Sequence, residues 1–173
     1  MKKVALVIGA GDATGGAIAR RFAREGYVAC VTRRSLDKLQ PLVDQIRAEG
    51  GQSHGFASDA RKEEEVIALV EQIESTIGTI EVMVFNIGAN VPSSILEQSA
   101  QKYFKIWEMA CFSGFLNGRE VAKRMVTRAG ADRRQTILFT GATASLRGAS
   151  GFAAFAGAKH ALRALAQSMA REL

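Results

Sequence analysis

Short apolar runs alternate along this chain with longer segments in which apolar residues recur every three or four positions. The runs are Lys3–Ile8, Tyr27–Thr32, Gly55–Ser58, Ile80–Phe85 and Thr136–Thr140. Most of them are almost continuously apolar, which is typical of strands buried on both faces of a parallel sheet. The pattern therefore predicts five parallel strands, of which Gly55–Ser58 carries the weakest signal.

The periodic segments between the runs predict helices over residues 15–25, 35–49, 62–77 and 99–129, with a last helix starting near Gly151. Ser35 is expected to cap the second helix, whereas Pro41 indicates that its regular part begins only shortly before that proline. Ser99 is expected to start the long fourth helix. Alternating strands and helices joined by right-handed crossovers predict a doubly wound parallel sheet, a Rossmann-type α/β fold. We expect a single domain over residues 1–173 with strand order 3-2-1-4-5.

The composition is that of an ordinary globular protein, with 173 residues, 47% of them apolar, and a net charge of +6. No apolar run approaches the roughly 18 residues that a membrane-spanning helix needs, and the first strand leads into glycines instead of a signal-peptide cleavage region. We therefore expect a cytoplasmic protein with no membrane partner. The basic residues are scattered, without the long basic run or interleaved aromatics of a nucleic-acid groove, so no nucleic-acid partner is expected.

The two cysteines, Cys30 and Cys111, lie far apart in apolar surroundings and show no metal-ligand spacing. Buried free thiols are favoured over a disulfide or a zinc site. No metal is expected.

A glycine-rich segment, Val7–Ala17, lies between the first strand and the first helix. Glycines at this place let the backbone turn tightly and approach a pyrophosphate, which the N-terminus of the helix then binds. The alternative is that the glycines only permit close packing of the helix on the strand. The position in the first β-α unit favours nucleotide binding.

The end of the second strand carries Arg33 and Arg34, where dinucleotide sites usually place an Asp or Glu for the ribose 2′-hydroxyl. Two guanidinium groups suit a 2′-phosphate, and each charge-assisted hydrogen bond contributes roughly 1.5–3 kcal/mol. The alternative is an exposed basic turn. The sequence thus predicts that NADP(H) is preferred over NAD(H).

These landmarks resemble the short-chain dehydrogenase/reductase family over essentially the whole chain. The family's TG-x-x-x-G-x-G turn maps onto Ile8–Gly15, with Ile8 in place of Thr and Ala13 in place of the middle Gly. Further matches are Asp59-Ala60 for the Asp-Val pair at the adenine ring, Asn86-Ile87-Gly88 for Asn-Ala-Gly, and Phe155-Ala156-Gly157-Ala158-Lys159 for Tyr-x-x-x-Lys.

The resemblance implies a set of cofactor-binding residues, and it places Arg34 where NADP-preferring members carry an arginine. The set is Gly9, Gly11, Asp12, Ala13, Thr14, Gly15, Arg33, Arg34, Asp59, Ala60, Asn86, Gly88 and Lys159. It also implies a homo-oligomer, a dimer or tetramer, formed through the long helix and the last helix.

The catalytic positions depart from the family pattern. In the family a Tyr exchanges the substrate proton, a Lys lowers its pKa and binds the nicotinamide ribose, a Ser orients the carbonyl, and an Asn holds a relay water. Lys159 is retained as the catalytic candidate, while Phe155, Ala142 and Cys111 stand at the Tyr, Ser and Asn positions. A slip of one residue would put Ala110 at the Asn position.

The resemblance therefore implies an oxidoreductase with a degenerate active site, in which ordinary ketone and alcohol chemistry is weak or absent. The alternative is a catalytically inactive NADP(H) sensor or oligomerisation partner. Thr143, Ser145, Tyr103 and His160 are the nearby groups that could replace the Tyr, and a structural role is favoured for each. Family members continue beyond a helix equivalent to the one that ends here at Leu173, so we expect a C-terminally incomplete chain.

Overall fold

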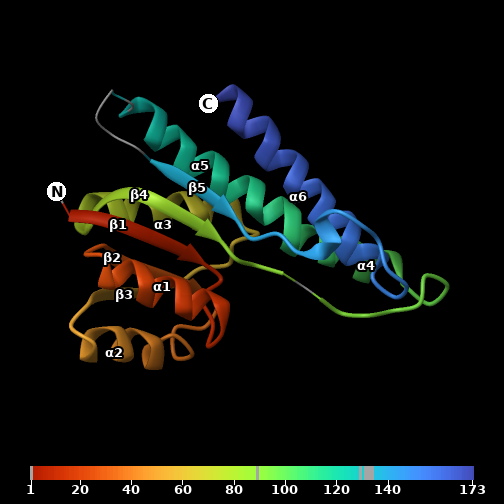
Figure 1. The fold of residues 1–173 in the computed structure, drawn as a ribbon, viewed down its shortest axis with the longest axis horizontal. Coiled ribbons are helices and arrows are strands. Elements are labelled where there is room, and N and C mark those ends of the chain that lie inside the picture. The colour runs from red at the N-terminus through yellow and green to blue at the C-terminus, as the bar shows by residue number, and fades with distance from the viewer. Residues whose placement is uncertain (1, 89, 129, 131–134) are drawn as a thin grey trace.

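The fold is a five-stranded parallel sheet covered by helices (Figure 1), in a computed structural model that describes residues 2–88, 90–128, 130 and 135–173. The strands are β1 (Lys2–Ile8), β2 (Val28–Arg33), β3 (Gln52–Ala57), β4 (Gly78–Phe85) and β5 (Thr136–Phe139). All neighbours pair in parallel in the order β3-β2-β1-β4-β5. The predicted order is confirmed, and it reverses beside β1, which is the switch point of such sheets.

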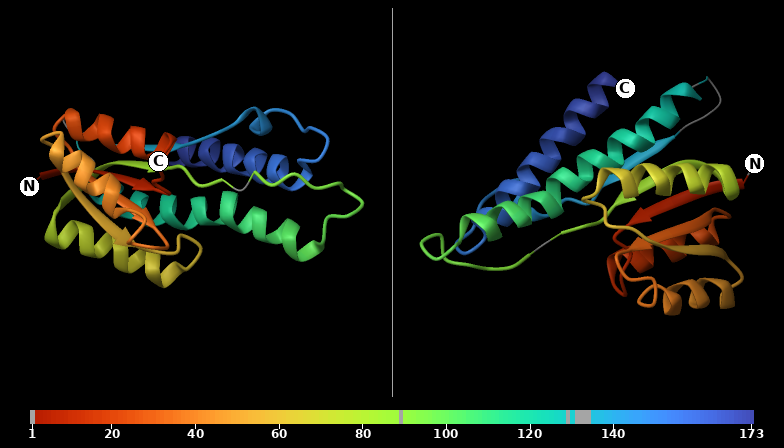
Figure 2. Two further views of the ribbon diagram at one scale, coloured as in Figure 1. Left: turned by 90° about the horizontal axis from the view of Figure 1, so that it is seen from below. Right: turned by 180° about the vertical axis from the view of Figure 1, so that it is seen from behind.

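The helices cover both faces of this sheet (Figures 1 and 2). They are α1 (Thr14–Arg24), α2 (Gln40–Ala48), α3 (Glu63–Thr76), α4 (Ala100–Trp107), α5 (Ser113–Thr127) and α6 (Ala153–Glu172), together with a π-helical turn η1 (Glu108–Phe112) and a 3₁₀ turn η2 (Thr143–Ser145). α1 and α2 pack on one face, while α3, α5 and α6 pack on the other. The doubly wound α/β class is thereby confirmed.

The core forms on both sides of β1. Because successive side chains of a strand point to opposite faces, Leu6 and Ile8 pack with α3 and α5, whereas Val7 packs with α1 and α2. Cys30 and Cys111 are buried free thiols, as predicted. Among the described residues no helix is both long and apolar enough to cross a membrane.

The start of α2 corrects one prediction and confirms another. Ser35 does not cap this helix, which begins at Gln40 with Leu39 as the residue before it and Pro41 in its first turn. Leu39 is fully buried, and its N–H donates to the carbonyl of Leu36 at 2.8 Å. Burial of Leu39 closes a separate turn after Ser35, so the helix starts where Pro41 indicated.

The predicted long fourth helix is interrupted in its middle. Ser99 caps α4 through its hydroxyl, which accepts from the N–H of Lys102, but η1 then separates α4 from α5. The π-helical turn brings residues five apart onto one face, and the rings of Trp107 and Phe112 stack with centroids 6.0 Å apart. Stacked pairs on either side extend this set into one aromatic row along the helices, formed by Phe104, Trp107, Phe112 and Phe115.

Candidate functional site

The glycine-rich turn contains two kinds of glycine. Gly9 has φ +82°, and a Cβ on Gly15 would lie 2.7 Å from the carbonyl oxygen of Gly9 and 2.8 Å from the Cα of Ala10. These two positions are fixed by backbone conformation and by close packing. A Cβ on Gly11, by contrast, would meet no atom of the described residues within 4 Å. Gly11 therefore borders open space, and packing alone does not require a glycine at this position.

The N-terminus of α1 follows this turn directly. Ala13 precedes the helix, and within the described part of the chain no side chain caps it. The first N–H groups of a helix have no partner inside the helix, so they remain available to an anion at this end. Asp12 and Thr14 lie beside them, and the Asp12 side chain is 94% exposed.

A pocket of about 170 Å³ opens at the carboxyl ends of β1, β2 and β3. Its lining comes from the glycine turn, the ends of β2 and β3 with the residues after β3, the segment after β4, η1 and the start of α5: Gly9, Thr32, Arg33, Arg34, Ser58, Asp59, Ala60, Arg61, Ile87, Met109 and Ser113. Five of the predicted cofactor residues thus lie around one pocket, although they are spread over 52 positions of the sequence. Parallel strands bring them together because their carboxyl ends share one edge of the sheet.

Two of the three arginines on the wall of this pocket, Arg33 and Arg34, have few partners. Arg33 donates from Nη1 to the carbonyl of Lys38 at 3.3 Å, and the same nitrogen lies 3.8 Å from Oδ1 of Asp12. Within the described residues no carboxylate lies within ion-pair distance of Arg34, although its charge helps to lower the pKa of Asp59. The wall is therefore positively charged.

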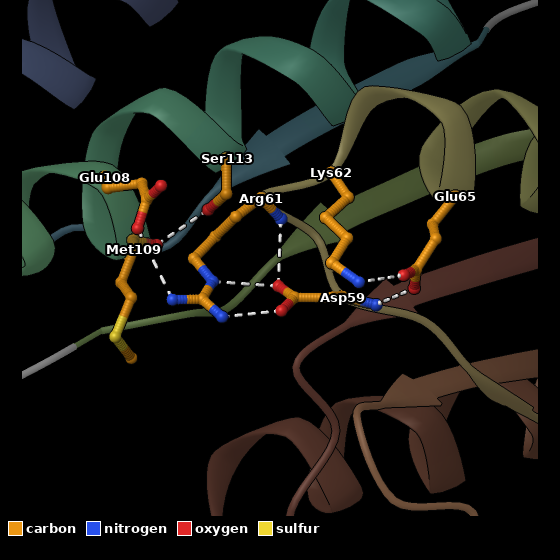
Figure 3. A network of polar contacts seen from close by, with 7 residues as sticks. All are labelled: Asp59, Arg61, Lys62, Glu65, Glu108, Met109 and Ser113. Carbon is orange, nitrogen blue, oxygen red and sulfur yellow. Dashed lines mark hydrogen bonds and ion pairs between the residues drawn. The ribbon is translucent and has the colours of Figure 1, made fainter.

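Asp59 is held by an arginine that the sequence analysis did not single out (Figure 3). Arg61 donates from Nε to Oδ1 of Asp59 at 2.9 Å and from Nη2 to Oδ2 at 2.6 Å, and its backbone N–H donates to Oδ1 at 3.2 Å. These hydrogen bonds lower the pKa of Asp59 to about 2, against the opposing effect of burial. The spacing of an acid and an arginine two residues apart in a loop was the available signal.

Further contacts tie this loop to the helices across the pocket (Figure 3). Nη1 of Arg61 lies 3.4 Å from Oε2 of Glu108 in η1. The Asn117 side chain of α5, which is buried, donates to the carbonyl of Ala60 at 3.2 Å. No local sequence signal points to Glu108 or Asn117, because their partners lie 47 and 57 residues away in the chain.

Asn86 and Gly88 lie between the glycine turn and α6. The Asn86 side chain donates from Nδ2 to the carbonyl of Gly9 at 3.4 Å. A Cβ on Gly88 would lie 3.6 Å from the Phe155 ring and 3.9 Å from Nζ of Lys159. The structure thus places the predicted Asn86, Gly88 and Lys159 along one path that starts at the glycine turn.

Lys159 is buried, with 3% of its surface exposed. Its Nζ donates to the carbonyls of Ile87 at 3.1 Å and Thr140 at 2.8 Å, so it links the ends of β4 and β5. Nζ also lies 5.9 Å from the centroid of the Phe155 ring. Among the described residues it has no carboxylate partner, and burial lowers its pKa. Burial raises the pKa of the nearby Cys111 thiol, an effect that the charge of Lys159 opposes.

A second pocket, of about 300 Å³, adjoins Phe155. It is lined by Asn90, Ala142, Thr143, Ala144, Arg147, Ala149, Phe152 and Phe155. Ser145 is not among these lining residues, and its buried Oγ accepts from the N–H of Ala142 at 3.1 Å. His160 bonds within its own helix, where Nδ1 lies 2.9 Å from the carbonyl of Ala156. Both geometries agree with the structural roles expected for these residues.

The reversed strand order, the glycine turn at the switch point and the pocket beside it are features of the doubly wound fold of the Rossmann type. Residues 3–173 match the model of one such family, described as short chain dehydrogenase. The chain therefore belongs to the short-chain dehydrogenase family of oxidoreductases, which bind nicotinamide dinucleotides.

Relatives with described activities are distant. The chain is 29% identical over 171 residues to a 2-dehydro-3-deoxy-D-gluconate 5-dehydrogenase of Formosa agariphila, covering 98% of this chain and 63% of the relative. It is 29% identical over 172 residues to a 2,3-dihydro-2,3-dihydroxybenzoate dehydrogenase of Bacillus subtilis, covering 99% of this chain and 64% of that protein. The chain thus spans less than two thirds of the length of these relatives.

Solved structures give the same assignment. A short-chain dehydrogenase from Rhodopseudomonas palustris is 50% identical with a TM-score of 0.90, covering 99% of this chain and 78% of that one. A metagenomic short-chain oxidoreductase in complex with NADP is 26% identical with a TM-score of 0.91, covering 99% of this chain and 76% of that one.

Proposed function

We propose that this protein is an NADP(H)-binding oxidoreductase in which ordinary ketone and alcohol chemistry is weak or absent. The observation that carries the cofactor preference is the pair Arg33 and Arg34 on the wall of the pocket, at the strand end where an NAD site places an acid. The observation that carries the chemical part is Phe155 beside Lys159, because a phenyl ring has no proton to exchange.

The described residues fit a dinucleotide. The open space at Gly11 and the uncapped start of α1 suit a pyrophosphate, with Gly9, Ala13, Thr14 and Gly15 shaping the turn. Asp59 and Ala60 border the pocket for the base, and Asn86, Gly88 and Lys159 continue toward the nicotinamide half. A bound nicotinamide supplies or accepts a hydride.

The arginine pair is tested by removing both charges. We expect the unchanged protein to bind NADPH at least about tenfold more tightly than NADH, because each charge-assisted bond to the 2′-phosphate contributes roughly 1.5–3 kcal/mol. Arg33→Gln with Arg34→Gln should abolish this ratio, measured by calorimetry at one moderate salt concentration. Arg21→Gln, on the exposed side of α1, is the matched control and should leave the ratio intact. Equal affinities in the unchanged protein would contradict the preference.

The weak chemistry follows from two missing groups. General acid–base catalysis contributes roughly 10²- to 10⁴-fold, and a lost hydrogen-bond donor to the reacting oxygen costs roughly another 10²- to 10³-fold. Phe155 supplies no acid, and Ala142 supplies no side-chain donor. The two factors need not multiply, since residues that act as a unit are not additive. A protonated imine needs less proton donation, so it escapes part of the loss.

The chemical part is tested by restoring both groups. Phe155→Tyr with Ala142→Ser should raise ketone reduction by at least about a hundredfold, followed through NADPH oxidation across ketones, alcohols and imines. Rapid ketone reduction by the unchanged protein would overturn this part and would assign the proton to another residue.

A second candidate is an inactive NADP(H)-binding protein. The two hydrogen bonds that Lys159 makes to the carbonyls of Ile87 and Thr140 favour it, because they give this lysine a structural role without proton transfer. NADPH binding without turnover of any substrate, imines included, would distinguish it from the enzyme.

The proposal includes a homo-oligomer formed through the long helical segment, which is α4 to α5 here, and the last helix, α6, of each copy. Phe104 begins the aromatic row and is 61% exposed while it stacks on Trp107. The other three rings, Trp107, Phe112 and Phe115, are half-buried. Aromatic side chains are enriched at the centre of protein interfaces. The second copy is the occupant that the family resemblance implies.

A further inference from the structure

Arg61 forms hydrogen bonds with both carboxylate oxygens of Asp59 in the wall of the pocket. Its Nε and Nη2 donate to the two oxygens of Asp59 at 2.9 and 2.6 Å, in the side-by-side geometry of a guanidinium–carboxylate fork. Its backbone N–H adds a third bond to Oδ1 at 3.2 Å. Both members are largely buried, with 23% and 15% of their side chains exposed. The acceptor capacity of Asp59 is therefore mostly used inside the protein.

A second acid fixes the same guanidinium from the opposite side of the pocket. Nη1 of Arg61 lies 3.4 Å from Oε2 of Glu108 in η1. A guanidinium carries five N–H donors, and these contacts use three of them. Two N–H donors of Arg61 remain for a ligand. The carboxylates of Asp59 and Glu108 hold the Arg61 side chain in place.

The proposed function decides which part of a ligand reaches Arg61. With the pyrophosphate at the turn around Gly11 and the 2′-phosphate at Arg33 and Arg34, the purine of the dinucleotide extends toward the wall formed by residues 58–61. That wall presents guanidinium donors where a free Asp59 would present acceptors. The present inference rests on that placement.

We propose that Arg61 selects the base, so that the pocket accepts a 6-oxopurine at least as well as adenine. Arginine recognises a purine that offers an oxygen at C6 together with N7, since both are acceptors. Adenine carries an amino donor at C6 instead, which suits a free carboxylate and opposes a guanidinium. Asp59 consequently acts as a positioning residue for Arg61, and it does not select the 6-amino group.

The test compares NADPH with its deaminated analogue, in which hypoxanthine replaces adenine. Dissociation constants measured by calorimetry should show the analogue binding as tightly as NADPH or more tightly. Arg61→Ala frees Asp59 to accept from the 6-amino group, so the ratio should move toward NADPH by about tenfold. Lys62→Ala is the matched control, because Lys62 bonds to Glu65 and does not line the pocket. It should leave the ratio unchanged.

Two outcomes would overturn the proposal. One is that the unchanged protein binds NADPH tenfold or more tightly than the analogue, and the other is that Arg61→Ala leaves the ratio where it was. If circular dichroism shows that Arg61→Ala is unfolded, Arg61→Lys supplies the comparison, because lysine keeps the charge and cannot form the fork.

These outcomes are distinguishable from failure of the proposed function. Equal affinities for NADPH and NADH would overturn only the preference for the 2′-phosphate. The test of Arg61 would be unaffected, because NADPH and its hypoxanthine analogue differ only in the base. Absence of binding by either dinucleotide would overturn the proposed function and this inference together.

Discussion

At the residue scale, the buried Lys159 and the partly buried Asp59 lie at the carboxyl edge of the sheet and have opposite kinds of partner. Lys159 is bonded to two carbonyls, so burial dominates and lowers its pKa. Asp59 is bonded to Arg61, so the partner dominates and lowers the pKa of Asp59 to about 2. In the first case burial disfavours the charged form, and in the second the charged form is stabilised by its partner.

The charge of Asp59 should stabilise the fold at neutral pH. A folded-state pKa of about 2 against an ordinary value of 3.8 corresponds to a stabilisation of about 2 kcal/mol at most. Because the folded pKa is the lower one, this contribution is complete above an ordinary Asp pKa and is lost as the pH falls through about 2. Asp59→Asn should therefore lower the free energy of unfolding by about 1–2 kcal/mol at neutral pH.

Urea unfolding of both proteins at a series of pH values checks this. The difference between them should stay constant down to about pH 4 and shrink toward pH 2. A difference that does not change with pH would show that the side-chain amide, and not the lost charge, causes it.

At the scale of elements, the turn between β1 and α1 contains a glycine that close packing requires, Gly15, and one that packing does not require, Gly11. Gly15 has backbone atoms within 2.8 Å of where a Cβ would lie, whereas Gly11 borders open space. Sequence shows both simply as glycine. The distinction arises because Gly15 packs against Gly9 and Ala10.

We expect Gly15→Ala and Gly11→Ala to fail in different ways. Gly15→Ala should lower stability by about 1–3 kcal/mol, the usual cost of overpacking against atoms that cannot move. Gly11→Ala should unfold like the unchanged protein but bind NADPH more weakly, since its methyl group enters the space that the pyrophosphate needs. Thermal unfolding and calorimetric titration of both variants measure the two effects. Gly11→Ala with unchanged NADPH affinity would place the pyrophosphate elsewhere.

The π-helical turn η1 is the other element that shapes the site. It supplies Glu108 to Arg61 and Met109 to the pocket, and it also keeps Trp107 and Phe112 on one face. The π-helical turn holds one residue more than a regular α-helical turn. Without this extra residue, the side chains of α5 would point about 100° further around the helix axis. The turn therefore sets both the pocket wall and the aromatic row.

At the scale of the whole molecule, α4 extends beyond the carboxyl edge of the sheet (Figure 2). Phe104, at the start of the aromatic row, is exposed, whereas Ile106 on the same helix is buried. A substitution of Phe104 therefore changes the surface and not the core. Phe104→Glu should convert the proposed oligomer to monomer while leaving NADPH binding intact. Light scattering after size-exclusion chromatography measures the mass. The exposed Lys102→Glu, on the same helix, is the control for added negative charge, and an unchanged mass in Phe104→Glu would exclude this surface.

The sequence by itself determined the strands, their order and five of the eleven residues that line the pocket. Continuous apolar runs such as Val4–Ile8 report burial on both faces directly, and β-α alternation leaves few topologies. Glycines and arginines directly after strands were informative because the carboxyl ends of parallel strands meet at one edge. Pro41 likewise marked the start of α2 through its own backbone restriction.

Only the tertiary structure decided the features that depend on distant parts of the chain. Burial of Leu39 displaced the expected cap at Ser35, and packing of the aromatic row accompanies the π-helical turn that periodicity did not reveal. The fork between Arg61 and Asp59 is local in sequence, but its anchor at Glu108 lies 47 residues away. Local pattern encodes burial and turns, whereas the partner of a charged side chain is set by which loops the folded sheet brings together.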